Sequence, residues 1–218
     1  MLNAFSDVDP RTELQHVGVA VKAMSDTQNH VGVIYRIDHA VWFLHLAWHF
    51  DLRNEPVRAD YHWGMCGLFV DDDLNGQVFA ARLLNVANNK GVIPYGFYAD
   101  GNAFDENGRF VSFPDPGMGL TCASFVIQLF QSFGHEICDI SGWQTREDDE
   151  AWQAEIIALI RENISHERAQ EVEAYVGRHR IRPEEAAAAV LNRAPPLEFD
   201  RAMNLAAEIN AQIRTARA

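Results

Sequence analysis

Three short apolar runs near the start of the chain constrain the fold more than any other feature. They cover residues 17–21, 31–37 and 40–48 and are rich in β-branched and aromatic residues, a composition typical of β-strands. The connections at residues 25–29 and 38–39 carry Ser, Asp and Asn, which favour turns. Since strands joined by so short a turn are antiparallel neighbours, the sequence predicts an antiparallel sheet.

A second constraint lies at residues 119–134, where the pattern predicts a helix with a cysteine at its start. Apolar side chains recur at helical spacing from Phe125 to Phe133, Thr121 is a suitable N-cap, and Gly134 is suited to end the helix. Cys122 then lies in the first helical turn. The free N–H groups and the helix dipole favour a thiolate there, which is the reactive form of cysteine. The alternative is a small buried hydrophobic residue, as free cysteines usually are.

The rest of the chain is predicted to be mainly helical. Helices are expected at residues 77–88, 147–162, 166–177, 183–191 and 199–216, whereas residues 91–116 are rich in Gly, Pro, Asn and Asp and predict a long loop. We therefore expect an α+β fold. Its first domain, residues 1–143, holds the sheet and the cysteine helix, and residues 144–218 form a helical extension.

Charge and composition exclude several classes of partner. The formal net charge of −13 argues against nucleic acid or an anionic membrane as a main partner. The cysteines, at positions 66, 122 and 138, form no CxxC pair, so neither a disulfide framework nor a zinc site is expected. No cofactor is expected either. The helical extension is a candidate surface for oligomerisation or partner binding.

The N-terminus has no basic start and no apolar stretch of a secretory signal, and the most apolar run, residues 40–46, is too short to span a bilayer. We expect a cytoplasmic protein without stable membrane insertion. Export by a route that needs no such signal stays open.

A cysteine nucleophile needs a base and a group that orients the base. Nine histidines are available, and position narrows the choice. His30 opens the second run after a polar turn, where a cleft at the end of the sheet is expected, and His45 lies within the third run. For any single histidine an ordinary structural role remains the alternative. No HExxH spacing supports a metal site, and Ser124 is not in a G-x-S-x-G elbow.

Four short segments together resemble the papain-like NlpC/P60 superfamily. Residues 119–126, around Cys122, are similar to its nucleophile motif, and residues 30–35 are similar to its H-x-G histidine strand. Residues 42–46 resemble the following strand, which supplies the third catalytic residue, and residues 94–97 resemble the segment with a tyrosine that lines the oxyanion site.

The histidine segments precede the cysteine helix here, which is the order of the circularly permuted branch that includes lecithin–retinol acyltransferase-like proteins. Chain order does not affect a triad that depends on geometry. The resemblance implies a papain-like fold with Cys122 as nucleophile, His30 as base and His45 as orienting residue. Tyr95 and Thr121 would belong to the oxyanion and substrate-binding site, with Tyr98 as the alternative to Tyr95.

The expected function is that of a cysteine hydrolase that cleaves an amide, either a peptide or an isopeptide bond, with peptidoglycan stem peptides as one class of substrate. The alternative within the permuted branch is an acyltransferase, a thioesterase or a lipid ester hydrolase. A hydrophobic groove beside Cys122 would favour acyl chains, and a polar open cleft would favour peptides. A third reading is a non-catalytic binding or scaffold protein.

Overall fold

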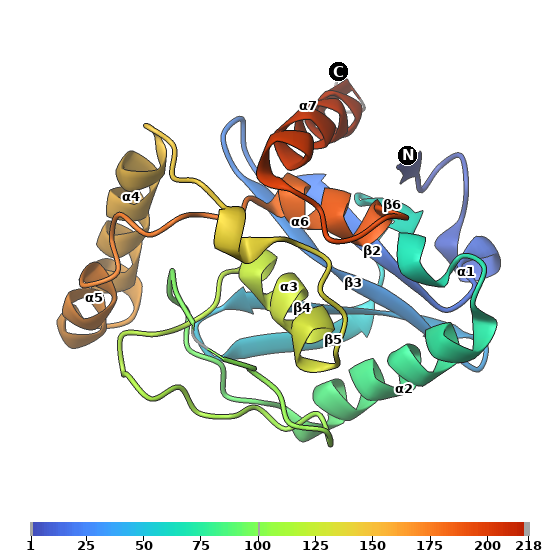
Figure 1. The fold of residues 1–218 in the computed structure, drawn as a ribbon, viewed down its shortest axis with the longest axis horizontal. Coiled ribbons are helices and arrows are strands. Elements are labelled where there is room, and N and C mark those ends of the chain that lie inside the picture. Colours follow the sequence, from blue (N-terminus) through green and yellow to red (C-terminus); the bar gives the residue numbers. More distant parts are fainter. Residues whose placement is uncertain (1, 100, 216–218) are drawn as a thin grey trace.

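A computed structural model describes residues 2–99 and 101–215 of the chain (Figure 1). In this part of the chain the strands form one antiparallel six-stranded sheet in the order β1-β6-β2-β3-β4-β5. The strands are β1 (Asn3–Ala4), β2 (Val17–Ala23), β3 (Asn29–Ile37), β4 (Ala40–Trp48), β5 (Asp51–Pro56) and β6 (His62–Met65).

The three predicted strands are confirmed as the neighbours β2, β3 and β4. The pairing runs from Val17↔Tyr35 to Ala23↔Asn29 between β2 and β3, and from Val33↔Leu44 to Ile37↔Ala40 between β3 and β4. The sequence did not predict β5, because Asp51–Pro56 carries a single large apolar residue. This strand is nonetheless paired with β4, since an edge strand needs only one hydrogen-bonded neighbour.

The helices are α1 (Pro10–Glu13), α2 (Asp73–Asn89), α3 (Cys122–Ser132), α4 (Asp149–Asn163), α5 (His166–Glu173), α6 (Pro183–Leu191) and α7 (Phe199–Thr215), with short 3₁₀ turns η1 (Gly67–Phe69) and η2 (Ile140–Gly142). The predicted helices are confirmed with shifted ends, and the predicted end at residue 216 lies outside the described residues. One shift is larger. The helix expected to reach Gly177 ends at Glu173, and Gly177 has a positive φ of 86°.

The α+β fold therefore agrees with the expectation, with the helices mostly C-terminal. One face of the sheet packs on α2, α3, α6 and α7, which Figure 1 shows in front of and around the strands. On this face, Val31 and Val33 of β3 contact the same core as Phe125 and Phe130 of α3. The opposite face carries Ile34 and is covered by side chains of the N-terminal arm and of the segment before β6, which are Phe5, Val8, Leu14, Val57 and Tyr61.

The helical extension divides between two places. Helices α6 and α7 share the main core with the sheet and α3. Helices α4 and α5 form a separate cluster with Tyr95 and Phe97 of the long loop and lie to one side of the sheet in Figure 1. The boundary at residue 143 stays a prediction, but the extension is packed on the rest of the chain. None of the described helices has the length and apolar character needed to cross a membrane.

Candidate active site

Cys122 is the first residue of α3, as predicted. Thr121 is the N-cap, with its hydroxyl accepting a hydrogen bond from the Ser124 N–H at 3.2 Å, and the Ser124 hydroxyl in turn accepts one from the Thr121 N–H at 2.8 Å. This capping box fixes the start of the helix. Thr121 is buried, and Cys122 is half-buried.

The charge state of Cys122 differs from the expectation. Burial raises the pKa of the Cys122 thiol to about 11, and the backbone N–H groups of Val31 and Ala123 only partly offset this rise. The prediction that the helix start favours a thiolate is therefore wrong for the resting protein. Removing the sulfur from water outweighs the helix N-terminus, since desolvation disfavours the charged form. At neutral pH Cys122 is a thiol, and a nucleophilic reaction requires a base.

His30 and His45 form a hydrogen-bonded pair, with 2.8 Å between His30 Nε2 and His45 Nδ1. The rings are nearly perpendicular, and His45 is stacked on Phe43 with ring centroids 4.3 Å apart. Gly32 makes room for this arrangement, because a Cβ at that position would lie 2.6 Å from the His45 Cβ. A larger residue than glycine at this position of the H-x-G segment would therefore clash with His45.

Both histidines are neutral at neutral pH. Burial is the main cause that lowers the pKa of His30 to about 3 and that of His45 to about 4, and neighbouring positive charges add to it. Since His30 Nε2 is bonded to His45, the free nitrogen of His30 is Nδ1. If His30 Nε2 donates, His30 Nδ1 is unprotonated and His45 carries its proton on Nε2.

Glu55 of β5 lies behind this pair and was not predicted. Its Oε1 is 3.5 Å from His45 Nε2, too far for a hydrogen bond, and the buried His45 Nε2 has no other partner among the described residues. A carboxylate at this distance favours positive charge on the histidine pair, and Asp51 acts in the same direction by raising the pKa of His45. Sequence reasoning missed Glu55 because it missed the strand that carries it.

Cys122 and His30 lie near the place where the pairing of β3 and β4 ends. The pairing of these strands ends at Val33↔Leu44, and β4 has a register shift between Leu46 and Trp48. His30 contacts Phe43 and Tyr61, which belong to the face opposite α3, whereas the Val31 backbone N–H faces the Cys122 sulfur. The cysteine thus meets β3 beyond its pairing with β4, where β3 is paired with β2 alone.

Cys122 and His30 line the same cavity of about 180 Å³. No hydrogen bond joins the two side chains within the described structure. The predicted nucleophile and base are thus brought to one cavity, and the predicted orienting residue, His45, is bonded to the base.

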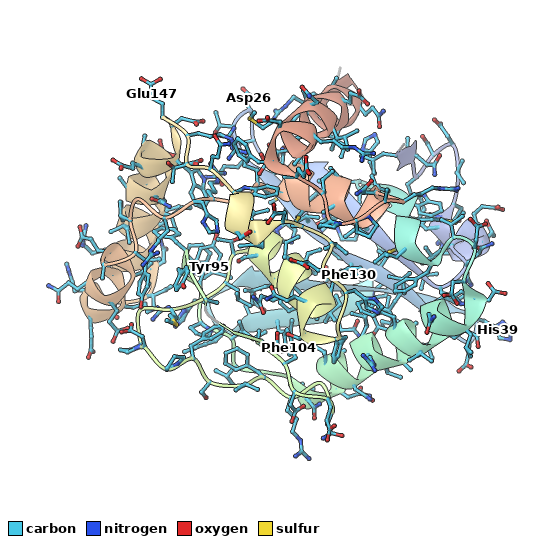
Figure 2. The ribbon with its side chains drawn as sticks, viewed as in Figure 1. Asp26, His39, Tyr95, Phe104, Phe130 and Glu147 are labelled. Atoms are coloured by element: carbon cyan, nitrogen blue, oxygen red, sulfur yellow. The ribbon has the colours of Figure 1, made fainter. Side chains whose placement is uncertain are left out.

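Tyr95 lines the cavity of Cys122, and Tyr98 does not. Figure 2 shows Tyr95 close to the N-terminal end of α3, in agreement with the isolated bridge between Tyr95 and Leu120. The Tyr95 N–H donates to His49 Nδ1 at 3.2 Å, and its carbonyl accepts from the Arg168 guanidinium at 2.7 Å. Burial raises the pKa of the Tyr95 hydroxyl, so it is a neutral donor. Tyr98 instead stacks on Tyr175.

The helical extension forms one wall of the site. Trp152 and Ile156 of α4, together with Arg180 and Ile181 before α6, line the cavity of Cys122. A second cavity of about 400 Å³ shares Trp152 and Arg180 and adds the polar side chains Ser124, Gln128, Gln131, Ser141 and Gln153. Sequence reasoning missed these wall residues. The sequence feature that could have revealed them is the basic segment 178–182, which holds three arginines and one histidine in an acidic chain.

The other cysteines have different surroundings. Cys66 and Cys138 are buried, and burial raises the pKa of both thiols. Among the described residues, no group of three or more His, Cys, Asp and Glu side chains is placed to hold a metal ion.

Comparison of the chain with protein-family models, with curated proteins and with solved structures gave no match.

Proposed function

We propose that this protein is a cysteine hydrolase that cleaves an amide bond through Cys122, His30 and His45. The observation that carries the proposal is the cavity lined by both Cys122 and His30, with His30 Nε2 bonded to His45 at 2.8 Å. A nucleophile at a helix start, a base and an orienting group are the parts that such chemistry needs. The permuted papain-like resemblance of the sequence is consistent with this reading.

The first step forms a bond between the Cys122 sulfur and the carbonyl carbon of the substrate. Because the resting thiol is protonated, its proton moves to His30 Nδ1 during the attack. The Cys122 N–H and the Tyr95 hydroxyl stabilise the oxyanion. The C–N bond then breaks, the leaving amine takes the proton from His30, and water hydrolyses the thioester to free Cys122.

His45 is a positioning residue in this proposal. It holds the His30 ring through the 2.8 Å hydrogen bond, and Glu55 at 3.5 Å from His45 Nε2 supplies negative charge. The carboxylate compensates in part for what a neutral histidine lacks as a third residue, since an imidazole alone does not offset the charge on an imidazolium.

The cavity that Cys122 lines is mainly apolar, but it adjoins a larger cavity that offers polar groups to a peptide-like substrate. The larger of the two neighbouring cavities, about 400 Å³, is lined by three polar side chains from α3 and by Arg180. The Ser124 and Gln128 side chains already have partners in the protein, so Arg180 and the exposed Gln131 are the groups of this wall that a substrate can engage. A peptide-like amide supplies donors and acceptors for them.

The test uses 4-nitrophenyl acetate, an activated ester that acylates nucleophilic cysteines. At pH 7.5 we expect a burst of one equivalent of nitrophenolate and a single acetyl group on the peptide that contains Cys122, located by mass spectrometry. Cys122→Ala should abolish the burst, and His30→Ala should slow acetylation by about 10² to 10⁴, the usual contribution of a general base.

Cys66 and Cys138 serve as internal controls, since both are buried thiols without a neighbouring histidine pair. Acetylation at equal rates on the three cysteines, or a rate at Cys122 that is unchanged in His30→Ala, would contradict the proposal and favour the scaffold reading.

A further inference from the structure

The Arg180 guanidinium is held by an aromatic ring and not by a carboxylate of the described residues. Its guanidinium carbon lies 3.6 Å from the centroid of the Trp152 ring, so the charged group is stacked on the indole. The guanidinium forms no hydrogen bond or ion pair with a side chain in the described parts of the chain. The nearby carboxylates are engaged elsewhere, because Asp149 accepts from the Arg146 N–H at 2.9 Å and Glu184 accepts from the Asn29 amide at 2.8 Å.

Keeping this charge at the cavity costs free energy. Burial lowers the pKa of Arg180, and the neighbouring Arg182 lowers it further. Arginine remains charged under all ordinary conditions, so the cost is not relieved by loss of a proton. A guanidinium that is stacked on an indole keeps its N–H edge available, and that edge matches the two oxygens of a carboxylate or a phosphate.

Arg180 also connects the two cavities. It lines the cavity of Cys122 and the larger neighbouring cavity, and its charge favours the Cys122 thiolate. The described residues that line these two cavities include no Asp or Glu, although the chain has 31 acidic residues. Because the lining holds Arg178 and Arg180 and no carboxylate, with Asp149 and Glu184 outside it, the cleft is complementary to an anion.

We infer that Arg180 binds an oxyanion of the substrate, a carboxylate or a phosphate, next to the bond that Cys122 attacks. The substrate class is therefore an amide that carries a negative charge close to the scissile carbonyl. The inference rests on the proposed function only in taking Cys122 as the reacting residue. The anion site itself belongs to the cleft and exists without turnover.

The test measures binding to the Cys122→Ser protein by calorimetry, so that no reaction interferes. Two probes differ by one charge and are otherwise alike: the α-amide of N-acetylglutamic acid and the α-amide of N-acetylglutamine. A third probe, the amide of N-acetyl-O-phosphoserine, distinguishes phosphate from carboxylate. We expect the anionic probes to bind at least about tenfold more tightly than the neutral one, the effect of one charge-assisted hydrogen-bonded pair.

Arg180→Gln should remove this difference, and Arg180→Lys should retain part of it, because lysine keeps the charge without the planar fork. Arg193→Gln is the matched control, since the Arg193 side chain is 68% exposed and lines neither of the two cavities. Circular dichroism is used to check that each variant is folded, and the comparison of the probes on the Cys122→Ser protein itself does not depend on the other variants.

Equal affinity for the charged and neutral probes, absence of binding by all three, or a preference that survives Arg180→Gln in a folded protein would overturn the inference. A tighter phosphoserine probe would identify phosphate as the anion, and a tighter glutamic acid probe would identify carboxylate. Because this assay uses protein without the nucleophile, its failure is separate from a failure of the acetylation test.

Discussion

Replacing Gly32 by alanine is the sharpest test of how the histidine pair is built. An added Cβ would lie 2.6 Å from the His45 Cβ, 2.6 Å from the Phe43 ring and 2.8 Å from the Leu44 carbonyl oxygen. The Leu44 carbonyl oxygen is backbone of β4, and the other two atoms belong to side chains of β4 residues. None of them is the free end of a flexible side chain, so relief requires β4 to move or His45 to turn away from His30.

The magnitude follows from two opposing effects. A Gly→Ala change without strain stabilises a protein by about 0.4–1 kcal/mol through the unfolded chain. Overpacking in a well-packed core costs about 1–3 kcal/mol, and loss of the His30–His45 hydrogen bond adds about 1 kcal/mol. The clash outweighs the entropic gain, and we expect Gly32→Ala to lower the free energy of unfolding by about 2 kcal/mol.

Urea unfolding followed by tryptophan fluorescence measures this change. Gly142→Ala is the matched control, because its added Cβ would meet only the carboxylate end of Asp139, at 2.8 Å, on the exposed turn η2. The effect of Gly142→Ala on the free energy of unfolding should stay within about 0.5 kcal/mol.

The acetylation rate of Cys122 in Gly32→Ala should fall about 10²-fold, the usual effect of misplacing a catalytic group by 1 Å. Unchanged stability would refute the steric reasoning, and unchanged acetylation in a destabilised variant would refute the positioning role of His45.

Two further predictions concern stability. The folded pKa of His45, about 4, is below its ordinary value of 6.5, so its contribution is fully present above about pH 6.5 and is lost as the pH falls toward 4, because the unfolded chain then binds a proton that the folded chain excludes. His45→Gln should therefore reduce the loss of unfolding free energy between pH 7 and pH 5 by about 2 kcal/mol; identical pH slopes in urea titrations of the two proteins would contradict this. Arg168→Met should cost about 3 kcal/mol, because the buried guanidinium donates to the carbonyls of Tyr95 at 2.7 Å and Met118 at 2.9 Å, and both acceptors would lose their partner. A change below about 0.5 kcal/mol in urea unfolding would show that water replaces these bonds.

Local patterns predicted the parts of the site that depend on neighbours in sequence. The β-branched runs gave the three central strands, since strand propensity and short turns act locally. Thr121 and Gly134 marked the start and the end of the cysteine helix for the same reason. Glu55 and the cleft wall, whose places depend on packing, were not predicted. Glu55 lies on a polar edge strand that only pairing with β4 creates, and Arg180 becomes part of the cleft only after α4 has packed beside Tyr95.

The amino-acid sequence by itself determined that a cysteine begins a helix and that two histidines lie on adjacent strands. The tertiary structure decided the chemical state of these groups. Burial of the Cys122 sulfur outweighs the helix N-terminus and raises its pKa to about 11, while burial of His30 lowers its pKa to about 3. The physical reason is that solvation depends on every element that covers a group, and α4, α6 and the long loop come from distant parts of the chain.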